Sequence, residues 1–308
     1  MIRTFSRIAL MAAGTLAFTS TGSFAQDGQG QAAPEDLAVA SAEPAGPALW
    51  QLADEDTTIY LFGTVHVLPA DVEWYDARIE RAFASSDVLV TEVDMTDQAG
   101  MTAIIGQRAL LEAGTTLRSM MSEEDRAEYE SAMQAMGLPP AALDQFEPWF
   151  AALNLSVIPL LQAGYDPNAG VEMALEARAG DKERGALETV EEQIALFDEM
   201  APEYQLTYLD TAVESLPEVV PMVGEMIAEW VEGDADRLGE IMNGEIDDPY
   251  LYNRLLVQRN ANWVGWIENR LEEPGIVFIA VGAGHLAGEG SVQDQLEDRG
   301  HTVTRILQ

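Results

Sequence analysis

The sequence predicts an α/β fold, with a mixed central sheet built from both ends of the mature chain and a largely helical inserted middle. Short β-branched and aromatic runs, typical of buried strands, lie near the two ends, at 57–62, 88–93, 276–281 and 303–306. Apolar residues between about 100 and 235 recur mainly at helical spacing. Two of the 3 histidines, His66 and His285, each close a Gly-x-x-His pattern directly after a strand-like run.

The first 25 residues are interpreted as a signal peptide. Arg3 and Arg7 precede the apolar run 8–18, and small residues lead to an expected cleavage site after Ala25. The apolar run is short for a membrane span, and no later run reaches the length that a span requires. The sequence therefore predicts an exported protein, periplasmic or secreted, without a membrane span.

The mature chain is expected to have two parts. Residues 26–47 are rich in Ala, Gly, Gln, Pro and acidic residues and show no periodicity, which is typical of a flexible acidic linker. The globular domain is expected to cover 48–308, with the helical insertion at about 100–235. The chain has no cysteine, so neither a disulfide nor a lipid anchor on cysteine is available.

The charge of the chain restricts its partners. The formal net charge is −37, and removing the signal peptide would make it more negative, because that segment carries two arginines and no acid. Such a charge repels nucleic acid and anionic lipid, and it favours cations and basic peptides. A general role in solubility explains the same composition. We therefore expect a peptide or another small periplasmic substrate, and no nucleic acid.

The expected elements begin with a hairpin. Strands at 49–53 and 57–62 flank Asp54-Glu55-Asp56 and lead to His66, and a helix at 74–85 precedes the strand at 88–93. Helical patterns then cover 101–112, 122–137, 141–163, 170–179, 190–200, 203–216 and 219–231.

The remaining elements return to the sheet. A brief strand at 185–188 ends at Thr189, which forms a Thr-x-x-Glu capping box and opens the helix at 190–200. A helix at 249–271 then precedes the strand at 276–281. The chain ends with a helix at 292–298 and a strand at 303–306.

Polar side chains follow four of the expected strands at the point where each ends. They are His66, Glu92, Glu188 and His285. If these strands are parallel, their carboxyl ends share one edge of the sheet, where ligands of α/β proteins bind. His66, His285 and Glu92 would then suit Zn²⁺, Mn²⁺ or Co²⁺, with a carboxylate outside the ligand set as general base. The alternative is a solvated rim of the sheet.

Arg259 and Asn260 lie on the helix expected at 249–271. Arg259 shares a stripe with Leu255 and Trp263, so its charge requires a buried acceptor. One interpretation places Arg259 against a site glutamate or a substrate carbonyl, with Asn260 as a second polar contact. The other is an internal salt bridge that ties the helix to the sheet.

Two further polar residues are interpreted as structural. Glu172 lies in the first turn of the helix at 170–179, where the helix dipole favours a negative charge, and a catalytic role is secondary. His301 lies between the last helix and the last strand and is expected to be a surface turn residue.

Several of these motifs, taken together and in order, resemble the TraB/GumN family, which includes the Tiki proteases and is similar to the erythromycin-esterase and ChaN-like superfamily. The matching segments cover nearly the whole mature chain: Leu61–His66, Ser86–Glu92, Leu187–Thr189, Glu192-Gln193, Arg259-Asn260 and Val281–Leu286. Tiki proteins are described as metal-dependent proteases that rely on two Gly-x-x-His motifs and glutamates. The resemblance carries these roles to His66, His285 and Glu92.

The expected function is an exported hydrolase that depends on a divalent metal, Mn, Co or Zn, and acts most plausibly as a peptidase. His66, His285 and Glu92 would hold the metal, and Glu92, Glu188, Arg259 and Asn260 would serve catalysis. The alternative is a non-catalytic periplasmic protein that uses the same pocket to bind haem, a small molecule or a partner. Haem binding is conceivable because histidine is a common axial ligand.

Overall fold

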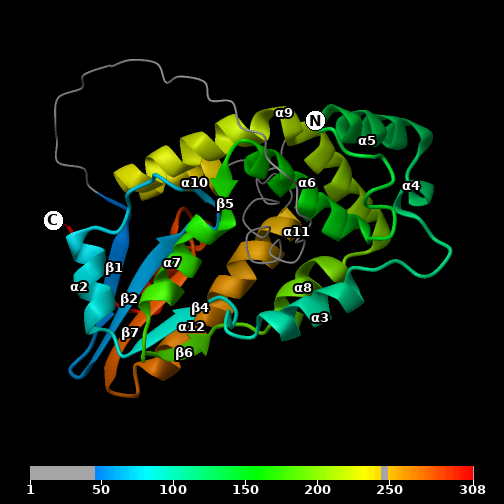
Figure 1. Cartoon of the computed structure of the whole chain (residues 1–308). Coiled ribbons are helices and arrows are strands. Elements are labelled where there is room, and N and C mark those ends of the chain that lie inside the picture. Colours follow the sequence, from blue (N-terminus) through cyan, green and yellow to red (C-terminus); the bar gives the residue numbers. More distant parts are fainter. Residues whose placement is uncertain (1–45, 244–248, 308) are drawn as a thin grey trace, which may run out of the picture.

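The computed structural model describes residues 46–243 and 249–307 (Figure 1). The expected signal peptide at 1–25 lies outside the described residues. The centre of the molecule is a six-stranded sheet in the order β6-β4-β7-β2-β1-β8. Its strands are β1 (Leu49–Ala53), β2 (Thr57–Thr64), β4 (Val88–Thr91), β6 (Glu183–Ala186), β7 (Gly275–Gly282) and β8 (Thr304–Arg305). The predicted α/β class and the mixed sheet with strands from both ends are confirmed.

Four strands of the sheet are parallel. β7 lies between β2 and β4, and β6 pairs with the outer side of β4, all in the same direction. β1 pairs antiparallel with β2, and β8 antiparallel with β1. In the register, Thr64 lies opposite Gly282, so β2 and β7 end side by side. The residues that follow β2, β4, β6 and β7 therefore meet at one edge of the sheet.

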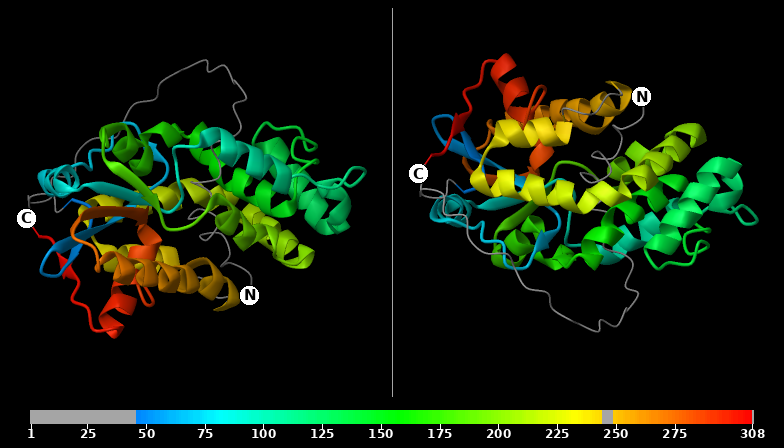
Figure 2. Two further views of the ribbon diagram at one scale, coloured as in Figure 1. Left: turned by 90° about the horizontal axis from the view of Figure 1, so that it is seen from below. Right: turned by 90° about the horizontal axis from the view of Figure 1, so that it is seen from above.

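Helices cover both faces of the sheet (Figure 2). One face, with Phe62 and Phe278, packs against α2 (Ala77–Ser85), α7 (Val171–Arg178), the second half of α9 (Pro202–Glu232) and α10 (Ala235–Asn243). The opposite face, with Leu61 and Ile279, packs against α12 (Gln258–Arg270) and α13 (Val292–Asp298). Burial on both faces explains why β2 and β7 read as nearly continuous apolar runs.

A helical part lies beside the sheet and has its own apolar core (Figure 1). Trp149 and Phe197 lie at its centre, and both are fully buried. Its helices are α3 (Gln98–Arg108), α4 (Leu117–Met120), α5 (Glu123–Ala135), α6 (Pro148–Gln162), α8 (Val190–Asp198) and the first half of α9. Because the two halves of α9 belong to different cores, this helix joins the helical part to the sheet.

The sequence predicted two helices where the structure has the single helix α9. Pro217, which lies inside it, removes a backbone donor and disfavours the preceding turn. Val213 and Val219 are buried on either side of it. Tertiary packing therefore outweighs the local cost of proline.

A two-stranded sheet near the strand ends was not predicted. β3 (Leu68–Pro69) pairs antiparallel with β5 (Tyr165–Asp166), which follows α6. A 3₁₀ turn (Pro167–Ala169) then leads into α7. The pair fixes the loop after His66 to the start of α7. Among the described residues, no helix is both long and apolar enough to cross a lipid bilayer.

Candidate functional site

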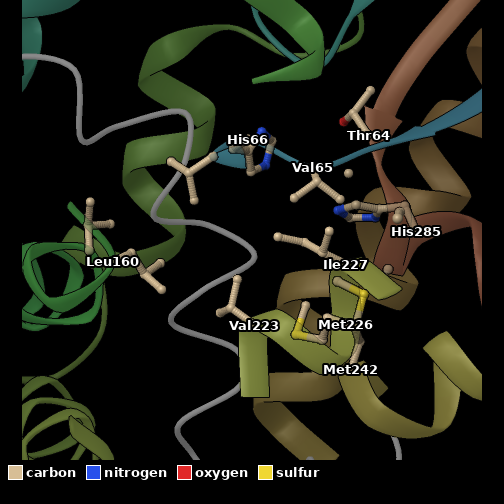
Figure 3. A pocket seen from close by; sticks show the side chains of 14 residues that line it. Thr64, Val65, His66, Leu160, Val223, Met226, Ile227, Met242 and His285 are labelled. Atoms are coloured by element: carbon tan, nitrogen blue, oxygen red, sulfur yellow. The ribbon is translucent and has the colours of Figure 1, made fainter. Parts of the chain in front are cut away.

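The side chains of His66, Glu92 and His285 surround one point at the carboxyl edge of the sheet. Gly282, the last residue of β7, marks that point. A Cβ atom placed on Gly282 would lie 3.1 Å from Glu92 Oε1, 3.7 Å from His66 Nε2 and 3.7 Å from His285 Cδ2. Figure 3 shows both imidazole rings at the same pocket. A methyl group at this position would contact both imidazoles and would press on the Glu92 carboxylate.

The first glycine of each Gly-x-x-His pattern has a packing role. A Cβ atom on Gly63 would lie 3.1 Å from both Cα and Cβ of Ala283, so the two patterns pack against each other across neighbouring strands. The Gly63 carbonyl accepts a hydrogen bond of 2.8 Å from Trp230 Nε1 of α9. The duplicated pattern thus reflects two parallel strand ends that approach closely, with a histidine after each.

Arg259 of α12 connects the polar side chains of the site. A guanidinium has five N–H donors, and here each is directed at an acceptor. Nε and Nη2 form a forked pair with Glu188, at 2.8 and 2.9 Å, and Nη2 also reaches Glu92 Oε2 at 2.7 Å. Nη1 donates to His285 Nε2 at 2.8 Å and to the Leu255 carbonyl at 3.2 Å. Arg259 thus contacts two glutamates and a histidine of the site.

The hydrogen bonds of His285 determine its tautomer. Asn260 Nδ2 donates to the Gly290 carbonyl at 2.9 Å, so its Oδ1 faces the imidazole and accepts from Nδ1–H at 2.6 Å. Nε2 is then the acceptor for Arg259. Burial, reinforced by the charge of Arg259, lowers the pKa of His285 to about 3. His285 is therefore neutral across the physiological range.

Glu92 is an ionised carboxylate in a buried position. Its Oε1 accepts from the Gly282 backbone N–H at 2.8 Å, and its Oε2 accepts from Gln193 Nε2 at 2.9 Å as well as from Arg259. Burial alone would raise its pKa, but the charge of Arg259, the two imidazoles and the hydrogen bond from the Gly282 N–H lower the pKa of Glu92 to about 2.

Glu188 is the second carboxylate held by Arg259. Its Oε1 also accepts from Trp263 Nε1 at 3.0 Å. Burial raises the pKa of Glu188, and the nearby charge of Arg259 offsets this only in part. The pKa values of these two neighbouring carboxyl groups are therefore shifted in opposite directions, that of Glu92 downwards and that of Glu188 upwards.

The sequence predicted one regular helix at 249–271, but the helix that carries Arg259 is interrupted by a π-helical turn. α11 (Pro249–Tyr252) passes into a π-helical turn (Asn253–Val257), which is followed by α12. The π turn contains Leu255, whose carbonyl accepts from Arg259. Such turns re-aim side chains and backbone groups within a helix.

Glu172 is a site residue that local sequence reasoning assigned to helix stabilisation. Its Oε1 lies 2.7 Å from His66 Nδ1 and also accepts from the Thr64 hydroxyl. The start of α7 is pressed against this loop, since a Cβ atom on Gly170 would lie 2.1 Å from the His66 carbonyl oxygen. Gly170, the N-cap residue of α7, permits this close approach because it has no Cβ atom.

Both histidines are thus held through Nδ1 by an oxygen, the arrangement that usually orients metal-ligating imidazoles. Nevertheless, within 46–243 and 249–307, no three His, Asp or Glu side chains are arranged to hold a metal ion. At His285 the reason is visible, because Nε2 already accepts a hydrogen bond from Arg259. Binding a cation there would require Arg259 Nη1 to leave Nε2.

Comparison with known sequences shows where this arrangement belongs. The model of the TraB/PrgY/gumN family matches residues 48–305, which is nearly all of the described chain. The chain belongs to this family. In the TraB/PrgY/gumN match, both Gly-x-x-His patterns, Glu92, Glu188 and Arg259 fall inside the matched range.

Individual relatives of this TraB/PrgY/gumN protein are distant. An uncharacterized protein of Treponema pallidum (strain Nichols) is 24% identical over 279 residues, covering 84% of this chain and 81% of its own length. The uncharacterized protein YbaP of Escherichia coli (strain K12) is 25% identical over 239 residues, covering 77% of this chain and 87% of its own length. No solved structure matches the chain.

Proposed function

We propose that the chain is a divalent-metal-dependent hydrolase, and more specifically a peptidase, that acts after export. The observation that carries this proposal is the convergence of His66, His285 and Glu92 around Gly282. Two imidazoles and an ionised carboxylate are suitable ligands for Zn²⁺, Mn²⁺ or Co²⁺. When bound, such an ion would acidify a water molecule and polarise a scissile carbonyl.

The balance of charge supports a cation. Three largely buried carboxyl groups, Glu92, Glu172 and Glu188, lie at this edge of the sheet, and Arg259 is the cation that contacts two of them. Beside Glu92, the buried Gln193 Oε1 has no hydrogen-bond partner within the described chain. An acceptor without a donor and an excess of carboxylates both favour a positive ion.

The other site residues would act by positioning. Glu92, with a pKa of about 2, is ionised at neutral pH and therefore suits the role of ligand better than that of proton acceptor. Arg259 and Glu188 fix the orientation of Glu92 and His285. Asn260 holds the His285 tautomer, and Glu172 holds the His66 ring. With its donors engaged, Arg259 would have to release one of these partners to contact a substrate.

The direct test measures metal and activity together. Wild type, His66→Ala and His285→Ala would be reconstituted with Mn²⁺, Co²⁺ or Zn²⁺, dialysed, and analysed for bound metal by mass spectrometry and for cleavage of a peptide library. We expect bound metal and cleavage in the wild type and in a control variant outside the site, and neither in His66→Ala or His285→Ala. His301→Ala is the matched control, since His301 lies away from the site and pairs with Glu268. Equal, negligible metal in all four proteins would contradict the proposal.

One observation favours a second candidate, a non-catalytic periplasmic protein that binds a small ligand or a partner. Both nitrogens of His285 and all donors of Arg259 are already engaged, as in a polar cluster that serves only to lock a fold. Haem titration would distinguish the candidates: a Soret shift that His66→Ala abolishes, without peptide cleavage, supports ligand binding. If Arg259→Met loses stability while wild type binds neither metal nor haem, the cluster is structural.

A further inference from the structure

An apolar pocket opens directly beside the two imidazoles. Its space between atoms is about 610 Å³, counted with its open mouth. The residues after β2 and β7 form one side, including His66 and His285. The opposite side consists of aliphatic and methionine side chains from α6, α9 and α10 (Figure 3): Val157, Leu160, Val223, Met226, Ile227 and Met242.

The apolar side chains that line the pocket determine which chemical groups can bind in it. Apart from the two imidazoles, none of the described residues that line this pocket has a titratable side chain. A charged or amide group would lose its hydration there without gaining hydrogen bonds, whereas an aliphatic group would gain apolar contacts. Met226 and Met242 are flexible and polarizable, so the pocket can adapt to chains of slightly different shape.

We propose that this pocket binds a leucine or methionine side chain of a peptide substrate, next to the bond that is cleaved. This inference rests on the proposed function. A side chain seated among Val223, Met226 and Ile227 would place its own backbone beside the two imidazoles, where cleavage would occur. The strongly negative chain repels a fatty acid carboxylate and attracts a basic peptide, which favours a peptide over an acyl chain.

Binding can be measured without hydrolysis. The metal-free protein would be labelled with ¹³C-methyl methionine, and the signals of Met226 and Met242 identified with Met226→Leu and Met242→Leu. The probes are N-acetyl-Lys-Ala-Xaa-Ala-Lys-amide peptides with Leu, Met, Ala or Asp as Xaa. We expect both signals to shift saturably with the Leu and Met peptides, and about tenfold weaker binding of the Ala peptide.

Variants on one helix provide the matched comparison. Ile227→Phe would fill the pocket and weaken binding of the Leu peptide about tenfold. Ala228→Phe, at the exposed neighbouring position of α9, would leave it unchanged. Met226→Ala would enlarge the pocket and shift the preference towards a peptide with Phe as Xaa, which keeps the test decisive if Ile227→Phe fails to fold.

The outcomes separate this inference from the proposed function. Selective shifts without cleavage in Mn²⁺, Co²⁺ or Zn²⁺ would support the pocket and contradict the peptidase. Cleavage that is equally fast for the Leu, Ala and Asp peptides would support the peptidase and overturn the pocket. Unchanged methyl signals, or signals that respond to octanoate and not to the Leu peptide, would also overturn it.

Discussion

At the scale of single residues, the site depends on what Arg259 does to its neighbours. The guanidinium keeps Glu92 ionised against the effect of burial, and it adds to the effect of burial that keeps His285 neutral. Removing such a charge would leave two carboxylates without compensation, which typically costs about 3–5 kcal/mol. The roles of the neighbouring residues therefore follow from one cation and its geometry.

The neutral state of His285 predicts a pH dependence of stability. The folded pKa of about 3 lies below the ordinary value of 6.5, so between these values the unfolded chain binds a proton that the folded chain does not. In metal-free protein, the free energy of unfolding should therefore fall as pH is lowered from 6.5 to 5, by up to about 1.4 kcal/mol per pH unit from this group. Urea unfolding at several pH values measures the slope.

His285→Phe should have a shallower slope, because it lacks the group that titrates. His301→Phe makes the same change outside the site and serves as the matched comparison for the loss of an imidazole. Glu92 contributes with the same sign only near pH 5, where the unfolded carboxyl with its ordinary pKa of 4.5 begins to bind protons, and all the proteins compared contain it. The raised pKa of Glu188 increases the free energy of unfolding as pH falls, which opposes the effect of His285. All the proteins compared contain Glu188, so it does not explain a difference between their slopes. Identical slopes in wild type and His285→Phe would contradict the assigned state of His285.

At the scale of elements, the sequence predicts strands and their ends better than it predicts contacts between elements. Apolar runs located β2, β4 and β7, and the polar residue after each could be read directly. The brief strand expected at 185–188 overlaps β6 but is displaced by two residues from Glu183–Ala186. Glu172 and Gln193 could not be assigned, because each lies on a helix whose docking is long-range. Because Glu172 lies in the first turn of α7, the helix dipole alone explains a negative charge there, so the sequence gives no reason to assign it to the site.

The close contact between α7 and the His66 loop leads to a prediction about two glycines. Gly170→Ala places a methyl group 2.1 Å from the His66 carbonyl oxygen, so α7 must move, and we expect a loss of about 1–3 kcal/mol together with weaker metal binding. Gly265→Ala is the control. It lies inside α12 with nothing within 4 Å of the new methyl group, and should stabilise by about 0.5–1 kcal/mol. Urea unfolding of both variants measures the difference.

The prediction fails if both glycine variants change stability equally. A stable Gly170→Ala protein with unchanged metal content would show that α7 does not control His66. The comparison is informative because both substitutions add one methyl group to a helix, and only one of them adds it against another segment.

At the scale of the whole molecule, the net charge of −37 creates self-repulsion that salt can screen. Raising NaCl from 0.01 M to 0.1 M shortens the screening length from about 30 Å to about 10 Å. We expect the melting temperature of the metal-free protein to rise over this range, as measured by circular dichroism. If screening is the cause, choline chloride should raise the melting temperature as much as NaCl does at the same concentration. A constant or falling melting temperature would contradict it.

The pairing of β2 with β7 also constrains when the protein can act. One histidine loop follows a strand near the beginning of the chain and the other follows a strand near its end, and each is shaped by contact with the other. During synthesis, the first loop emerges long before its counterpart exists. A nascent chain whose β7 has not yet been synthesised, or a chain truncated before β7, consequently cannot assemble the complete centre.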